Sequence, residues 1–167
     1  GIEDWFDKDV STLSGGQKQL LNLASVMVMQ PELLILDEPT AQLDPIAASE
    51  FIATVRKINR ELGLTVIITE HRLEEVFPYS HRVLVMDEGR LIADGTPAQV
   101  GQALKQAGHR MFASMPTPMQ VYAAVDNDLA CPVTVREGRD WLDAFAKAHP
   151  LGQVPPENIP APASNIP

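Results

Sequence analysis

The sequence predicts an α/β domain built around a parallel sheet. Two apolar runs, residues 33–36 and 64–69, are continuous rather than alternating, which is typical of strands covered on both faces. Helical patterns separate the apolar runs, so strand and helix alternate along the chain. The chain has 167 residues, of which 45% are hydrophobic, and this suffices for one domain with a sizeable core.

The first half of the chain contains residues that are typical of the starts and ends of helices. A turn over residues 13–16 leads into a helix predicted over 17–30, which is so apolar that we expect it to be buried on most sides until Pro31 ends it. The first strand, 33–36, is closed by two acidic residues. The next helix is predicted to begin at Asp44 as N-cap, with proline in its first turn, and to end at Gly63. Its expected buried face consists of Ile52, Val55, Ile58 and Leu62.

The second half continues the alternation and then weakens. After the strand at 64–69 we expect a short helix at 73–77, a third strand at 82–86, a turn at Glu88 and Gly89, a returning strand at 90–94 and a helix at 97–106. Two further helices are predicted near 119–125 and 135–147. We therefore divide the chain into an α/β part over 1–108, a small helical appendage over 109–149 and a proline-rich linker or tail over 150–167.

Charge and cysteine content narrow the class of protein. The net charge is −9, which disfavours a broad nucleic-acid-binding face because such a face needs clustered lysine and arginine. The single cysteine, Cys131, excludes a disulfide within the chain and suits a reducing compartment. No uncharged apolar run approaches the roughly 18–20 residues that span a bilayer, so we expect any membrane partner to be a separate chain or segment.

The pentapeptide over residues 13–17 is a candidate anion site. Ser14 and the pair Gly15 and Gly16 precede a helix, where backbone amides and the helix dipole favour a phosphate. The alternative is structural: Ser14 caps the helix and the glycines form a tight turn.

Acidic and imidazole side chains follow the two apolar strands. Asp37 can hold Mg²⁺, and Glu38 can orient and deprotonate a water. His71 comes just after the next strand and should lie near both, because parallel strands end at the same sheet edge. Each residue alone is more often a solvated strand end.

The order of these motifs closely resembles the ATPase subunit of ABC transporters over residues 1–108. On that resemblance, 13–17 is the signature motif, 33–38 is Walker B, 42–44 is the D-loop and His71 is the switch histidine. The resemblance implies a partial P-loop NTPase core with ATP and Mg²⁺ as cofactors. It implies catalytic roles for Glu38 and His71, and metal binding by Asp37. Nucleotide contacts are implied for Ser14, Gly15, Gly16, Gln17 and Asp44.

Finer motifs resemble the energy-coupling-factor type of vitamin and metal importers. The stretches 19–24 and 70–76 carry this likeness, and 132–139 is similar to the segment that follows the first ATPase domain of a fused tandem. The implied partners are a second ABC ATPase domain, packed head to tail across two ATP molecules, and transmembrane transporter subunits. The implied location is the cytoplasmic face of the membrane.

One expected motif is absent from the sequence. No glycine is followed by lysine, so the phosphate-binding loop G-x-x-x-x-G-K-[ST] is missing. We therefore expect a fragment that is inactive alone and that self-associates through an uncovered core. A non-catalytic regulatory or binding module, or an ABC ATPase of DNA repair or translation, are the alternatives.

Overall fold

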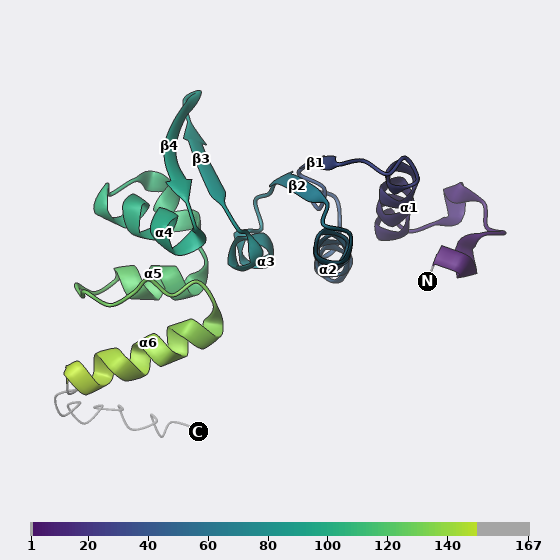
Figure 1. The fold of residues 1–167 in the computed structure, drawn as a ribbon. Helices are drawn as coiled ribbons and strands as arrows, with labels where there is room; N and C mark the ends of the chain where they lie inside the picture. Colours follow the sequence, from purple (N-terminus) through teal and green to yellow (C-terminus); the bar gives the residue numbers. More distant parts are fainter. Residues whose placement is uncertain (1, 150–167) are drawn as a thin grey trace, which may run out of the picture.

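The computed structural model describes residues 2–149. In the first half, two short 3₁₀ helices precede two helices and a two-stranded parallel sheet (Figure 1). Their bounds are η1 Ile2–Trp5, η2 Val10–Thr12, α1 Gly15–Met27, β1 Leu33–Asp37, α2 Pro45–Leu62 and β2 Thr65–Thr69. The predicted parallel pairing is confirmed, with Ile35 opposite Ile67 and Asp37 opposite Thr69.

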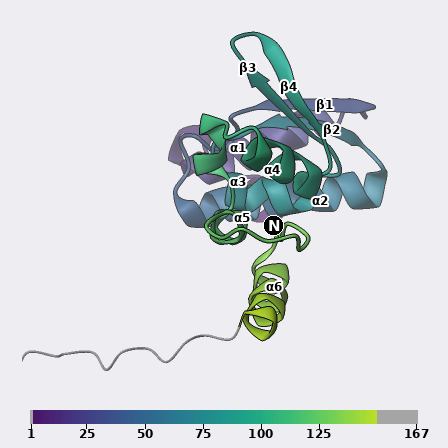
Figure 2. The same cartoon turned by 90° about the vertical axis from the view of Figure 1, so that its left-hand side faces the viewer.

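The second half holds an antiparallel hairpin and a stack of helices. The bounds are α3 Leu73–Val76, η3 Phe77–Tyr79, β3 Val83–Asp87, β4 Arg90–Gly95, α4 Pro97–Gln106, η4 Arg110–Ser114, α5 Thr117–Ala123 and α6 Val135–Ala148. The hairpin and the α4, α5 and α6 helices match the predicted elements within two residues. Figure 2 shows α6 projecting away from the strands. The proline-rich linker or tail predicted over 150–167 lies outside the residues that the structure describes.

Helix α2 begins and ends where its sequence signals predict. Asp44 accepts hydrogen bonds from the amides of Ile46 and Ala47, both at 3.0 Å, and therefore caps the helix. Gly63 ends it with φ of 66°, a left-handed conformation that costs glycine little. Of the expected buried face, Ile52 and Val55 are buried and Ile58 is half-buried against the same cluster, but the prediction for Leu62 is wrong, since its side chain is 67% exposed.

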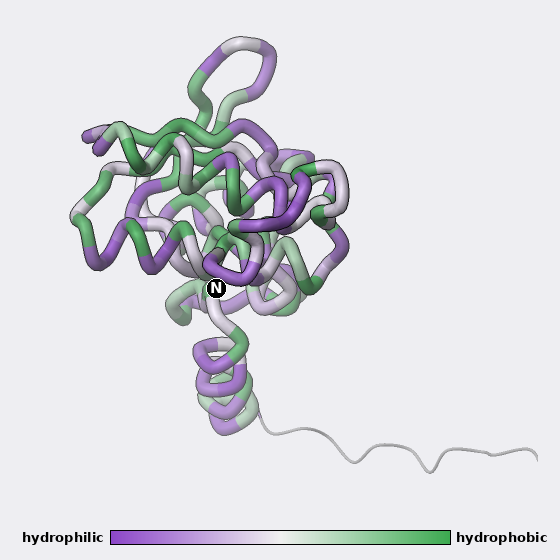
Figure 3. The backbone as a smooth tube through the Cα atoms, turned by 90° about the vertical axis from the view of Figure 1, so that its right-hand side faces the viewer, coloured by the Kyte–Doolittle hydropathy of each residue, from purple (hydrophilic) through white to green (hydrophobic). Residues whose placement is uncertain are grey.

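Two predictions about burial are wrong. Strand β1 is covered on one face only: Leu34 is buried, whereas Ile35 is 65% exposed. Helix α1 is not buried on most sides, since Leu23 is its only buried residue, and it ends at Met27, before Pro31. The first error arises because α2 covers one side of the parallel sheet and nothing in residues 2–149 covers the other; the second arises because α1 packs mainly on α2, which covers only one of its sides. Figure 3 shows the hydrophobic strand segments running along one side of the molecule, below the hydrophilic hairpin tip.

Two hydrophobic clusters form the interior. One joins α1, the parallel sheet and α2 around Phe51, which is 1% exposed. The other joins the hairpin, α4, α5 and α6 around Met119 and Trp141. The second cluster runs across residue 108, so the helical appendage packs directly on the hairpin and α4. The division at that residue stays a prediction. No helix between residues 2 and 149 has the length and hydrophobicity that a bilayer span requires.

Candidate functional site

Asp37, Glu38 and His71 meet at the carboxyl edge of the parallel sheet. Asp37 is the last residue of β1, and the Thr69 hydroxyl at the end of β2 donates a hydrogen bond to its carboxylate. Glu38 then adopts a left-handed backbone with φ of 44°, unusual for a residue with a side chain, and its amide donates to the Thr69 carbonyl at 3.0 Å. The sharp turn keeps both carboxylates at this edge.

His71 lies against Glu38, as the sequence predicts. Its Nε2 is 2.9 Å from Glu38 Oε1, and the two side chains are 82% and 48% exposed. The imidazole thus orients the carboxylate, and the second carboxylate oxygen has no protein partner among the described residues. A positioned carboxylate with a free oxygen at a solvent-facing edge has the chemistry to orient a water and accept its proton.

Glu70 is a part of this edge that the sequence analysis missed. Its Oε1 accepts hydrogen bonds from the Thr40 amide at 3.0 Å and the Thr40 hydroxyl at 2.6 Å, and its Oε2 accepts from the His71 amide at 3.2 Å. Thr40 is 1% exposed, so this carboxylate satisfies buried donors. Glu70 therefore clamps the loop after β1 to the loop that carries His71. A glutamate beside the histidine was visible in the sequence, but its partner was not.

A second link joins the His71 loop to the start of α2. Arg72 donates from Nη2 to the Leu43 carbonyl at 3.2 Å, next to Asp44. Asp44 itself is occupied as the α2 cap. The predicted D-loop is therefore held from both sides, by Arg72 and by its own cap.

Ser14 and Gln17 form a reciprocal cap at the start of α1. The Gln17 amide donates to Ser14 Oγ at 3.2 Å, and the Ser14 amide donates to Gln17 Oε1 at 2.9 Å. The structural alternative for Ser14 is thus present. The amides of Gly15 and Gly16 occupy the first helical turn, where no intrahelical acceptor exists, so they remain available to an anion.

The two glycines differ in what surrounds them. A Cβ on Gly16 would lie 2.8 Å from the Ala47 Cβ on α2, a contact that neither rigid atom can relieve, so Gly16 allows α1 and α2 to approach. A Cβ on Gly15 would meet Leu43 at an ordinary 3.7 Å. Glycine is therefore needed for packing at Gly16 and not at Gly15.

Alanine substitutions at Gly15 and Gly16 should differ in their effect on the stability of the chain. We expect Gly16→Ala to lower the free energy of unfolding by about 1–3 kcal/mol, the usual effect of overpacking. Gly15→Ala should keep or slightly raise stability, because alanine favours the helix by up to about 1 kcal/mol. Urea unfolding of both variants measures this. Equal losses of stability at the two positions would contradict the packing assignment of Gly16.

The donors fit part of a nucleotide and metal site. Mg²⁺ takes one or two protein carboxylates together with phosphate oxygens and waters, and Asp37 supplies one such carboxylate. Within residues 2–149 no cluster of three or more His, Cys, Asp or Glu side chains could hold a metal unaided. The hollow beside Ser14 and Gln17 has a volume of about 220 Å³, below the roughly 300–1,000 Å³ of complete ligand pockets.

The predicted site residues fall into two groups. Asp37, Glu38 and His71 share the sheet edge, and the signature residues lie with Asp44 at the starts of α1 and α2. Within residues 2–149, no hydrogen bond or ion pair connects the side chains of the first group with those of the second. The arrangement therefore offers two partial sites rather than one closed pocket.

Comparison with known proteins agrees with this geometry. Residues 1–41 match the family model described as ABC transporter. A relative from Bacillus cereus, named an ABC transporter ATP-binding protein, is 48% identical over 87% of the chain and 26% of its own length. The energy-coupling factor transporter ATP-binding protein EcfA1 of Caldanaerobacter subterraneus is 48% identical over 60% of the chain and 36% of its own length. The chain thus spans about a quarter to a third of these relatives.

The fold leads to the same class. The structure of cbiO1 from Clostridium perfringens, part of the ABC transporter complex cbiONQ, superposes with a TM-score of 0.56 and 38% identity, over 72% of this chain and 47% of that one. The parallel strand pair, with Asp37 at the end of β1 and Glu38 and His71 just beyond the strands, together with this match, defines a nucleoside triphosphatase fold of the α/β class. The chain belongs to the ATPase domains of ABC transporters.

Proposed function

We propose that this chain supplies the water-activating and signature parts of an ATP-hydrolysing domain that powers an importer. The observation that carries the proposal is the 2.9 Å pair of Glu38 and His71 beside Asp37 at the carboxyl edge of the parallel sheet. Ligands of open α/β sheets bind beyond this edge.

Each group of residues has a distinct role in the proposal. Asp37 holds Mg²⁺ through its carboxylate, and Mg²⁺, when bound, neutralises charge on the phosphates. Glu38 accepts a proton from the attacking water while His71 keeps its carboxylate in place. The Gly15 and Gly16 amides and the Ser14 hydroxyl contact the nucleotide of a second ATPase domain, together with Gln17 and Asp44.

The phosphate-binding loop must then come from further polypeptide. The described strands form two separate two-stranded sheets, so β2 and β3 each keep an edge without a strand partner among residues 2–149. We infer that the strand leading into the phosphate loop pairs at these edges and covers the exposed side of β1 and β2. The length of the relatives leaves room for it, and this chain alone is then inactive.

The likenesses support an importer of the energy-coupling-factor type. EcfA1 carries that description in its name, and cbiO1 is described as part of a transporter complex. The proposed partners are transmembrane subunits and a second ATPase domain. The second ATPase domain is fused to this one in a single polypeptide, and the assembly lies at the cytoplasmic face of the membrane. The transported vitamin or metal ion is not defined by these residues.

Adding the phosphate-loop half should create activity. We expect no ATP hydrolysis by residues 1–167 alone and Mg²⁺-dependent hydrolysis once the preceding segment of the same gene is included, measured as phosphate release with and without EDTA. The reason is that the loop supplies most β- and γ-phosphate contacts. Hydrolysis by residues 1–167 alone, or none by a folded longer protein that contains a phosphate loop, would contradict the proposal.

A further inference from the structure

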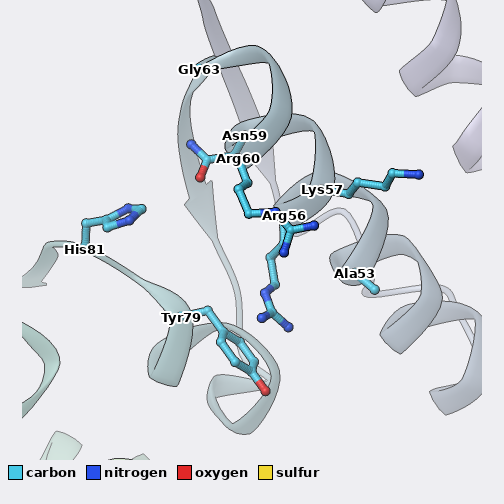
Figure 4. Close-up of a pocket in the computed structure, with 8 residues that line it drawn as sticks. All are labelled: Ala53, Arg56, Lys57, Asn59, Arg60, Gly63, Tyr79 and His81. Atoms are coloured by element: carbon cyan, nitrogen blue, oxygen red, sulfur yellow. The ribbon is translucent and has the colours of Figure 1, made fainter.

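A basic groove lies on the far half of α2, away from the sheet edge just described. It has a volume of about 680 Å³ and lies between α2 and the segment from Tyr79 to His81 (Figure 4). Asp44, at the start of α2, is sixteen residues before Arg60, which places the groove about 24 Å along the helix from the proposed nucleotide contacts. The groove is the larger of the two hollows described here, and no role in the proposed reaction uses it.

Positive charge is concentrated in this groove. Arg56, Lys57, Arg60 and His81 line it, and no lining residue is acidic, in a chain whose net charge is −9. Arg60 has a distant partner, Glu61 at 3.7 Å, on an exposed surface where such a pair stabilises little. Among the described residues, Arg56, Lys57 and His81 have no ion pair. Figure 4 shows Lys57 pointing away from Tyr79 and His81, so Arg56 and Arg60 are the cations that serve the groove, and the His81 ring lines it beside them.

Arg56 is held in place by an aromatic ring. Its guanidinium carbon lies 3.2 Å from the centre of the Tyr79 ring, a stacking that fixes the plane of the guanidinium. No protein acceptor among the described residues takes a hydrogen bond from Arg56, so its N–H groups are free to face a ligand. A planar guanidinium with free donors matches the paired oxygens of a phosphate.

The spacing of the two arginines adds a reason for an anion. Arg56 and Arg60 are four residues apart on α2 and therefore lie on the same helix face, where like charges repel. An anion with more than one charge, bound between them, removes that repulsion. His81 lines the same groove from the segment before β3.

We propose that this groove binds a soluble ligand that carries phosphate groups. Its volume falls within the roughly 300–1,000 Å³ of small-molecule sites. Arg56 and Arg60 line the groove from α2, and Tyr79 and His81 line it from the segment before β3, so the groove has two walls, which favours a small ligand over a bilayer. The acidic chain as a whole opposes nucleic acid.

Pyrophosphate titration of residues 1–167 tests the proposal, because the sequence has no phosphate loop and the loss of binding in groove variants separates the groove from the amides at the start of α1. Calorimetry at about 150 mM salt should detect binding by the native chain. The double variant Arg56→Gln with Arg60→Gln should bind at least about tenfold more weakly, as expected for lost charged hydrogen bonds. Tyr79→Leu, which removes only the stacking, should weaken binding less. Arg139→Gln, an exposed cation on α6, is the matched control and should bind as the native chain does.

Three outcomes would overturn the proposal: no pyrophosphate binding by the native chain, equal weakening in the Arg139 control, or unchanged binding in the double variant. A parallel experiment uses vesicles of phosphatidylcholine with and without phosphatidylserine. Binding to the anionic vesicles that depends on Arg56 and Arg60, without pyrophosphate binding, would assign the groove to a membrane surface instead. Far-UV circular dichroism checks that each variant is folded.

Discussion

Replacing Glu38 with glutamine, in the longer protein that contains a phosphate loop, is expected to lower ATP turnover by about 10²–10⁴-fold. Glutamine keeps the size and the hydrogen bond to His71, but its amide cannot accept a proton from water. Because binding groups are unchanged, ATP should still bind and hold two ATPase domains together. Steady-state phosphate release and size-exclusion chromatography with ATP measure the two effects.

The control for this variant lies at the other end of the same strand. Glu32 precedes β1 at the opposite end from Glu38 and is exposed, so Glu32→Gln makes the same chemical change away from the sheet edge. It should leave turnover unchanged. His71→Ala should also slow turnover, because Glu38 loses the partner 2.9 Å away. Normal turnover in Glu38→Gln would remove Glu38 from the role of general base, and normal turnover in His71→Ala would remove the switch assignment.

Local signals in the sequence predicted the elements well. Helix boundaries depended on residues whose chemistry acts within one turn, such as the Asp44 cap and the left-handed Gly63. The meeting of Glu38 and His71 followed from a simple topological rule, that parallel strands end together. The prediction that Glu38 and His71 lie close together therefore needed only the strand pairing to be right, while the roles of the two residues stay a prediction.

Partners distant in sequence were beyond such reasoning. Glu70 and Thr40 are thirty residues apart, and only the observed pairing of β1 with β2 places them in contact. Burial of β1 was overestimated for another reason. A continuous apolar run predicts that both faces of a strand are covered, but it does not identify the residues that would cover them. The uncovered Ile35 is consistent with a cover supplied by residues that lie outside this chain.

The exposed side of the parallel sheet should make residues 1–167 self-associate. Leu33, Ile35 and Ile67 are 47%, 65% and 51% exposed, and Ile35 and Ile67 are register partners on neighbouring strands. Residues 109–149 pack on the hairpin and α4, so within the described structure they do not cover this face. Exposed apolar faces and unpaired strand edges drive association. We expect oligomers at micromolar concentration by light scattering, together with binding of an apolar dye.

Lysine substitutions identify the surface responsible. The double variant Ile35→Lys with Ile67→Lys places charge on the open face, and because both side chains are already exposed it should shift the chain toward monomer without unfolding it. Val121→Lys, at a 42% exposed position on α5, is the matched control and should associate as the native chain does. Equal effects of the two changes would place the association elsewhere. A native chain that is monomeric, unfolds cooperatively and binds no apolar dye would mean that this face is covered by the chain itself, and would remove the main physical reason for inferring a missing half.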